Sequence, residues 1–212
     1  PEESSLAKLI KQNPEKLEIH ELDLESQSSI NDCAGEIINS NVSLDLILNV
    51  SGFLHGDSMQ PEKRVSDLSF ESLSKNFATN AFGPILLTSK LLPLLKDSPH
   101  SVIANLSAKV GSIEDNNTGG WYGYRSSKAA QNMLTKNLAI ELSRNSRFNT
   151  LCVSLHPGTV DTDLSKPFSK NIDSSNLFTP QESVENLIKV INNLNEEDTG
   201  NFFDWSGNKI PW

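Results

Sequence analysis

A tyrosine and a lysine four residues apart, Tyr124 and Lys128, are the residues in this sequence best suited to chemistry. They fall in a segment expected to be helical, and on an α-helix positions i and i+4 lie on the same face. An unperturbed tyrosine has a pKa of about 10 and exchanges protons poorly near neutrality. A fixed ammonium beside the phenol would lower that pKa and make Tyr124 a practical general acid or base for a carbonyl or an alcohol. The alternative interpretation is an ordinary pair on an exposed helix face.

The elements expected around this pair alternate between strands and helices, which is typical of α/β architecture. Three short apolar runs are expected to be buried parallel strands, and long helical segments separate them. A bend is expected at Pro84, and Thr179 with Pro180 is expected to begin the last helix. The predicted strands are 17–24, 44–50, 101–106, 150–155 and 200–205, and the predicted helices are 4–12, 26–39, 69–96, 122–144 and 180–194.

Small and polar residues follow each of the three buried runs. Ser51-Gly52 follows the first, Ser107 the second and Pro157-Gly158 the third. In an open parallel sheet, ligands bind at the carboxyl ends of the strands. The helix that carries Tyr124 begins close to the same edge, so the sequence predicts a ligand site there.

Length and composition limit the classes of function. A chain of 212 residues suits a single domain, 1–212, with a sizeable core. The net charge of −9 argues against nucleic acid or an anionic membrane surface as the main partner. No apolar run is long enough to span a bilayer and no signal-peptide pattern is present, so we expect a cytoplasmic protein. The two cysteines are expected to be buried reduced thiols, and the four scattered histidines lack metal-ligand spacing, so no metal site is predicted.

Four stretches carry a resemblance to a known family. They are Leu-Asn-Val-Ser-Gly-Phe-Leu-His at 48–55, Asn-Leu-Ser-Ala-Lys-Val-Gly-Ser-Ile at 105–113, Gly-Gly-Trp-Tyr-Gly-Tyr-Arg-Ser-Ser-Lys-Ala-Ala at 119–130 and His-Pro-Gly-Thr-Val-Asp-Thr at 156–162. In this order and spacing they resemble the short-chain dehydrogenase/reductase family, and within it the C-factor-like branch. The similarity runs from about residue 15 to Trp212. It implies an NAD(P)(H)-dependent oxidoreductase on a Rossmann-like, doubly wound parallel α/β sheet.

The resemblance also implies catalytic roles. Tyr124 would be the general acid or base, and Lys128 would lower its pKa and bind the hydroxyls of the nicotinamide ribose. Ser107 would hydrogen-bond the substrate oxygen, and Asn80 would hold a water in the proton relay.

The cofactor implied is NADP or NAD, and the choice cannot be read from this sequence. The substrate would be a small molecule with a carbonyl or alcohol group, selected by the variable loop 163–179. Cofactor contacts would come from the strand ends: Asp23 and Leu24 beside the adenine, Asn49, Ser51 and Gly52 under the cofactor, and Pro157, Gly158, Val160 and Thr162 at the nicotinamide carboxamide.

The sequence departs from the family pattern at several points. Ala108 stands where the commonest serine motif has its catalytic serine, and Val50 replaces the usual asparagine. The phosphate-binding stretch Thr-Gly-x-x-x-Gly-x-Gly is not found, and no glycine precedes Gly35. We therefore expect an N-terminally truncated version of a longer enzyme that lacks strand 1, its helix and strand 2. The alternative is a natural short form in which strand 3, at 17–24, docks directly against strand 4, at 44–50.

Two functions follow. The first is an oxidoreductase that passes hydride to or from a carbonyl or alcohol, with Tyr124 as the proton donor or acceptor. The second is a non-catalytic signalling or interaction protein of the same family, or an inactive fragment unable to bind dinucleotide. Helices 69–96 and 122–144 are the surfaces this family uses for dimers, so a homodimer or homotetramer is expected.

Overall fold

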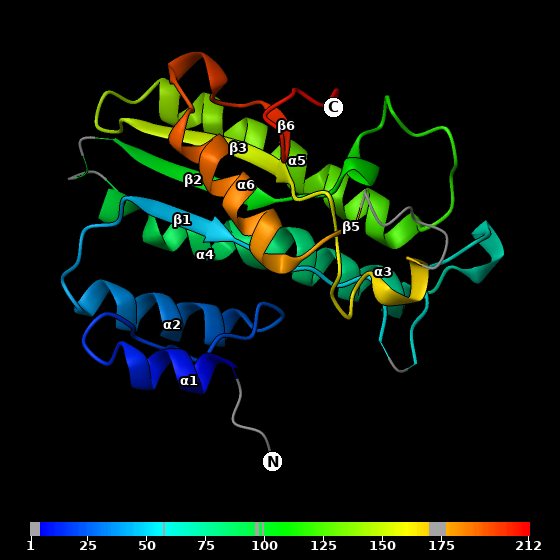
Figure 1. Cartoon of the computed structure of the whole chain (residues 1–212), viewed down its shortest axis with the longest axis horizontal. Coiled ribbons are helices and arrows are strands. Elements are labelled where there is room, and N and C mark those ends of the chain that lie inside the picture. The colour runs from blue at the N-terminus through cyan, green and yellow to red at the C-terminus, as the bar shows by residue number, and fades with distance from the viewer. Residues whose placement is uncertain (1–4, 57, 96–97, 99, 170–176) are drawn as a thin grey trace.

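A parallel four-stranded sheet forms the centre of the protein (Figure 1). The structure is a computed structural model that describes residues 5–56, 58–95, 98, 100–169 and 177–212. The sheet order is β1-β2-β3-β6, and all three pairings are parallel. The strands are β1 (Leu46–Asn49), β2 (Ser101–Leu106), β3 (Thr150–His156) and β6 (Phe202–Asp204).

Helices cover both faces of this sheet, as Figure 1 shows. On one face α2 (Gln27–Asn39), α4 (Gly83–Leu91) and α5 (Tyr122–Ser143) pack over apolar side chains of β1, β2 and β3. On the other face α6 (Pro180–Asn192) packs over β2, β3 and β6. This arrangement confirms the predicted doubly wound, Rossmann-like α/β class.

Local sequence signals account for the helix ends. The Thr179 hydroxyl accepts the backbone N–H of Glu182, whose carboxylate accepts the N–H of Thr179, so a capping box begins α6 as predicted. The Ser26 hydroxyl caps α2 in the same way, through Ser29. The predicted first helix is α1 (Ser5–Gln12).

The helical run predicted at 69–96 contains a π-turn. It comprises α3 (Phe70–Phe77), a π-helical turn (Ala78–Phe82), α4 and a 3-10 turn (Leu92–Leu95). Residues 96 and 97 lie outside the described residues. The irregularity precedes Pro84, which stands in the first turn of α4. A π-turn holds one residue more than an α-turn, and here it buries Asn80 completely.

The predicted strand at 17–24 is wrong. The segment is irregular, and Leu17, Ile19 and Leu22 are 40%, 52% and 37% exposed. A strand needs a neighbouring ladder, and within the described residues no strand pairs with this segment. The alternative in which it docks against β1 as a strand is therefore also not found.

The two edges of the sheet differ. In the described part of the chain β1 pairs with β2 alone. The outer edge of β6 is covered by the chain that follows it. Backbone bonds run from Asp204 N to Asn208 O and from Ile210 N to Phe202 O. Such pairing within the chain prevents the edge strand from pairing with a strand of another protein molecule.

Both cysteines are buried and free, Cys33 in α2 and Cys152 in β3, as predicted. Among the described residues no helix has the length and apolarity needed to cross a bilayer. The same residues include no group of three or more His, Cys, Asp or Glu placed to hold a metal ion.

The α1–α2 connection approaches the first residue of α4, Gly83, closely. A Cβ added there would lie 2.5 Å from Leu24 Cβ and 2.6 Å from Leu24 O, which no side chain can occupy without displacing backbone. We expect Gly83→Ala to lower the free energy of unfolding by about 1–3 kcal/mol, measured by urea denaturation. Gly35→Ala is the matched control, because a Cβ on that α2 glycine meets nothing within 4 Å. It should stabilise the helix by about 0.5–1 kcal/mol. Equal destabilisation by both variants would contradict this packing.

Candidate active site

The ammonium of Lys128 is buried where two strands end. Lys128 lies in α5 and is 2% exposed. Its Nζ donates to the backbone oxygen of Leu106 at 2.7 Å, to Gln131 Oε1 at 3.0 Å and to the backbone oxygen of Ser51 at 3.4 Å. Leu106 ends β2 and Ser51 follows β1. A single side chain therefore ties α5 to the carboxyl ends of two strands.

Tyr124, one turn before Lys128, is buried against aromatic side chains. Its ring meets that of Trp121 edge-on, with centroids 6.3 Å apart. Trp121 also contacts Phe168 at 4.8 Å, and Phe168 contacts His55 at 5.6 Å. Loop 53–56 and the segment after β3 thus meet beside the helix start. These rings form one wall of the candidate site.

The expected lowering of the Tyr124 pKa is wrong for this structure. Burial raises the pKa of Tyr124 to about 12, and burial lowers the pKa of Lys128 to about 7. The Lys128 ammonium lies 6.0 Å from the centre of the Tyr124 ring and donates to carbonyl oxygens instead. Loss of hydration therefore outweighs the attraction between phenolate and ammonium.

Ser107 directly follows β2, beside the carbonyl that binds Lys128. Its backbone N–H donates to the oxygen of Leu155 at 2.7 Å, which fixes the residue between β2 and β3. Its hydroxyl is buried and has no hydrogen-bond partner within the described residues. A buried hydroxyl without a partner is costly unless it serves a ligand. Ala108, at the adjacent position, offers no hydroxyl.

Asn80 uses its side-chain amide to fix the loop after β1. Its Oδ1 accepts the N–H of Phe53 at 2.6 Å, and its Nδ2 donates to Phe53 O and to Ser127 Oγ, both at 2.9 Å. Ser127 is the residue before Lys128. The π-turn thus links the β1 loop to the helix of the candidate site.

Asn49 is the last residue of β1, and Ser51 and Gly52 follow it. Asn49 Nδ2 donates to Asn105 Oδ1 at 2.6 Å and to Thr88 Oγ1 at 3.1 Å, which joins β1, β2 and α4. The Ser51 hydroxyl donates to Thr79 O. A Cβ on Gly52 would lie 3.9 Å from Lys128 Nζ, so Gly52 lines the same site.

The segment after β3 forms a separate rim of the same sheet edge. Gly158 has φ +79, and a Cβ there would lie 2.5 Å from the Phe178 ring. Val160 belongs to β4 (Thr159–Val160), which pairs with β5 (Leu177–Phe178). Pro157 O accepts the Ser183 hydroxyl, and Thr162 Oγ1 donates to Val160 O. Two residues of this segment contact the aromatic wall: Leu164 O lies 3.1 Å from His55 Nε2, and the Phe168 ring contacts Trp121 and His55. Residues 170–176 of the predicted substrate loop lie outside the described residues.

Asp23 and Leu24 lie in the connection that precedes α2. Asp23 Oδ1 accepts the N–H of Glu25, and its own N–H donates to Ser29 Oγ. Leu24 packs against Gly83 at the start of α4. No contact with Tyr124 or Lys128 is among their interactions in the described structure.

Two residues of the site were missed in the sequence. The buried Glu62 carboxylate accepts the Gly123 N–H at 3.1 Å and the Ser72 hydroxyl at 2.7 Å. It caps α5, because Trp121 is left-handed at φ 50 and provides no side-chain cap. Gln131, three residues after Lys128, binds its ammonium. A polar residue at i+3 of a predicted active-site lysine was the available signal for Gln131. Glu62 carries no local signal.

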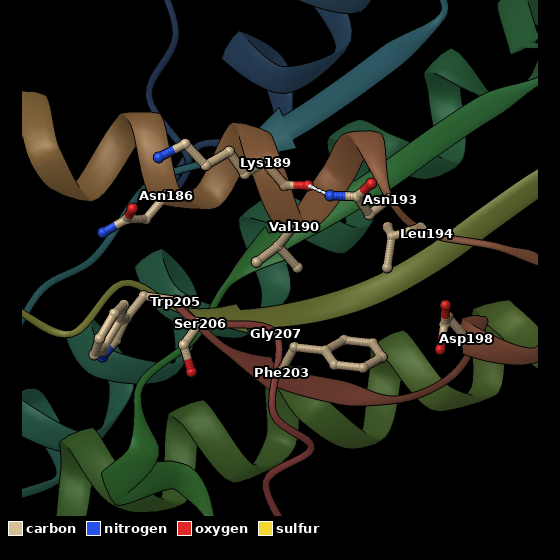
Figure 2. Close-up of a pocket in the computed structure, with 10 residues that line it drawn as sticks. All are labelled: Asn186, Lys189, Val190, Asn193, Leu194, Asp198, Phe203, Trp205, Ser206 and Gly207. Carbon is tan, nitrogen blue, oxygen red and sulfur yellow. Dashed lines mark hydrogen bonds between the residues drawn. The ribbon is translucent and has the colours of Figure 1, made fainter.

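A cavity of about 370 Å³ lies apart from these residues, between α6 and the chain that follows β6 (Figure 2). Val190 and Leu194 line it from α6, and Phe203, Trp205 and Ser206 line it from β6 and the following turn. None of the predicted site residues lines it. We therefore place the candidate active site at the strand ends, where the predicted site residues lie, and not in this cavity.

Comparison with known proteins decides the family. Residues 2–173 match the family described as short chain dehydrogenase. The chain belongs to the short-chain dehydrogenase family. This membership, together with the dehydrogenase and carbonyl reductase relatives below, supports an oxidoreductase.

Similar proteins include members with and without a named substrate. The short-chain dehydrogenase chain is 37% identical to C-signal of Myxococcus xanthus over 148 residues, which cover 70% of this chain and 83% of the relative. It is 32% identical to 1-hydroxy-2-glutathionyl-2-methyl-3-butene dehydrogenase of Rhodococcus sp. (strain AD45), covering 90% and 78%. The NADPH-bound carbonyl reductase from chicken fatty liver superposes with a TM-score of 0.85 at 30% identity, covering 98% and 81%. The C-factor-like resemblance is confirmed.

The lowered pKa of Lys128 makes stability depend on pH. Between about 7 and the ordinary value of 10.5, the unfolded chain holds a proton on Lys128 that the folded chain lacks. The free energy of unfolding should therefore gain up to about 1.4 kcal/mol per pH unit as the pH rises through this window. Lys128→Met should remove that gain, measured as urea denaturation from about pH 7 to about pH 10.

Lys90→Met controls for the loss of a positive charge, because Lys90 is an exposed lysine of α4. Equal slopes for wild type and Lys128→Met would mean that burial does not depress the pKa of this lysine.

Proposed function

We propose that this chain is a nicotinamide-dinucleotide-dependent oxidoreductase that reduces a carbonyl group or oxidises the matching alcohol. The observation that carries the proposal is the convergence of three groups. Tyr124 and Lys128 stand on one helix face, and the unpartnered hydroxyl of Ser107 follows the carbonyl to which Lys128 donates. An oxygen of a substrate needs a proton donor and an orienting hydrogen bond, and these groups offer both.

The residues on the nicotinamide side fit a dinucleotide. The Ser107 hydroxyl is buried without a partner, and Gly52 leaves open the space that a Cβ would take beside Lys128 Nζ. Lys128 would hold the ribose hydroxyls, and Asn49 and Ser51 would support the cofactor from below. Pro157, Gly158, Val160 and Thr162 would face the carboxamide, with Asp23 and Leu24 toward the adenine. When bound, the cofactor donates or accepts the hydride.

The protein's own residues would handle the proton. At neutral pH a phenol with a pKa of about 12 keeps its proton, so Tyr124 is ready to give it to a carbonyl oxygen as that oxygen gains negative charge. Ser107 would donate a hydrogen bond to the same oxygen. Asn80 would position the water that returns a proton to the site. The protonated phenol is the form from which reduction starts, and oxidation would start from the phenolate.

The rings beside Tyr124 support an apolar or aromatic substrate. Trp121, Phe168 and His55 form a wall in which adjacent rings meet edge-on at centroid distances of 4.8 Å and 5.6 Å. Flat carbonyl compounds would pack on such a surface. A solved structure similar to this chain is, by its name, a carbonyl reductase, so its substrates are also carbonyl compounds.

A second candidate is a non-catalytic protein of the same family. It is favoured by the 37% identity to C-signal, a relative whose name gives a signal and no reaction. Dinucleotide binding separates the two candidates.

We also propose a homodimer or homotetramer in the cytoplasm. Exposed apolar side chains occur on the two helices that the family uses for dimers: Phe82 and Leu86 on the π-turn and α4, and Met133 and Ile140 on α5. Burial of such side chains favours association. A monomeric mass by light scattering would count against this oligomer.

Calorimetric titration with NADPH and with NADH, on wild type and on Tyr124→Phe, tests the proposed function. We expect both proteins to bind one of the two dinucleotides with similar affinity, because the phenol oxygen is directed at the substrate. Oxidation of the bound dinucleotide by para-nitrobenzaldehyde should be at least about 100-fold slower in Tyr124→Phe. Failure of a folded wild-type chain to bind either dinucleotide would support the second candidate.

A further inference from the structure

The ammonium of Lys128 has three protein acceptors in this structure. They are the backbone oxygens of Leu106 and Ser51 and the side-chain oxygen of Gln131. A lysine ammonium has three N–H donors, and the longest of these contacts, 3.4 Å to Ser51 O, is the one that a ribose hydroxyl would most readily replace. Two of the acceptors are backbone groups fixed at the ends of β1 and β2. The third acceptor, Gln131 Oε1, is a side-chain atom.

We propose that Gln131 is a positioning residue of the active site: its side-chain oxygen holds the Lys128 ammonium against the strand ends and favours its charged form. The inference rests on the proposed function, because Lys128 is the ammonium of that site. Gln131 acts through Lys128 and has no contact with Tyr124 among its hydrogen bonds in the described structure.

The alternative interpretation is a core glutamine without a role. Gln131 is 3% exposed, and its Nε2 has no hydrogen-bond partner in the part of the chain that the structure describes. It lines a cavity of about 10 Å³ together with Asn105 and Thr135. A buried amide that leaves both of its N–H groups unsatisfied is a costly way to fill this space. Leucine or methionine would fill the same volume without that cost. The bond from Lys128 is the interaction that an apolar residue could not make.

The surroundings of Lys128 make such an acceptor effective. Burial brings the pKa of Lys128 to about 7, so small changes in its partners alter the charged fraction near neutrality. From α5, the titratable group facing it is Tyr124, with the ring centre 6.0 Å away. From β1 and β2, carbonyl oxygens face it. Within the described residues no carboxylate or second cation shifts its pKa. The groups that accept hydrogen bonds from its Nζ are all neutral, and Gln131 Oε1 is one of them.

The test is an NMR titration of Lys128 in the unliganded protein, following its Cε chemical shift with isotope-labelled lysine and assigning the signal with Lys128→Met. Gln131→Glu places a carboxylate at the acceptor and should raise the pKa of Lys128 by about 1 to 3. Gln131→Met removes the acceptor at similar volume and should lower that pKa by about 1. A residue with a purely structural role would not shift the pKa in opposite directions.

Asn132→Leu is the matched control. Asn132 is also 3% exposed and leaves its Oδ1 unpartnered, but its Nδ2 donates to Gly111 O rather than contacting Lys128. It should leave the pKa of Lys128 unchanged. The proposal is overturned if Gln131→Met leaves that pKa in place or raises it.

Gln131→Met decides the test, because the carboxylate of Gln131→Glu would raise the pKa of a neighbouring ammonium whatever the native side chain does. If Gln131→Met fails to fold, as judged by circular dichroism, Gln131→Leu replaces it. The titration needs no cofactor. Failure of dinucleotide binding by calorimetry would therefore remove the proposed function without changing this result, and an unmoved pKa beside normal NADPH binding would remove only the role of Gln131.

Discussion

A single buried ammonium determines how α5 meets the sheet. Lys128 can be buried because the backbone oxygens of Leu106 and Ser51, at the ends of parallel strands, accept hydrogen bonds from its Nζ. A residue without a side chain, Gly111, lies directly beside Lys128. A Cβ on Gly111 would lie 2.8 Å from Lys128 Cβ. α5 must therefore approach the loop after β2 closely for the ammonium to reach its acceptors.

Polar side chains, rather than apolar packing, preorganise the loops of the site. Asn80 fixes the loop after β1 through both backbone groups of Phe53, and Glu62 fixes the first turn of α5 through Gly123. Both are buried, so their hydrogen bonds act in surroundings where water competes little. Catalytic groups held by such a second layer keep their geometry before any ligand arrives.

The sequence predicted those elements of the fold correctly whose structure is determined by a local pattern. The apolar run of β2 and the capping box of α6 were predicted almost to the residue, since each signal lies within its own element. The alternation at 17–24 failed because a strand also requires a neighbour that sequence periodicity does not supply. The site motif identified Tyr124 and Lys128, but not the direction of the Tyr124 pKa. That direction depends on burial, and burial, like the contacts of Glu62 and Gln131, is created by elements distant in the chain.

The reactivity of the two buried thiols would report local opening of the structure. Cys33 and Cys152 lie in one apolar cluster, one in α2 and one in a central strand. Neither can react with an alkylating reagent until its surroundings open. Release of α2 alone exposes the first thiol, whereas the second requires separation of the sheet from α5. The difference between their labelling rates would therefore measure how independently the amino-terminal helices detach from the rest of the domain.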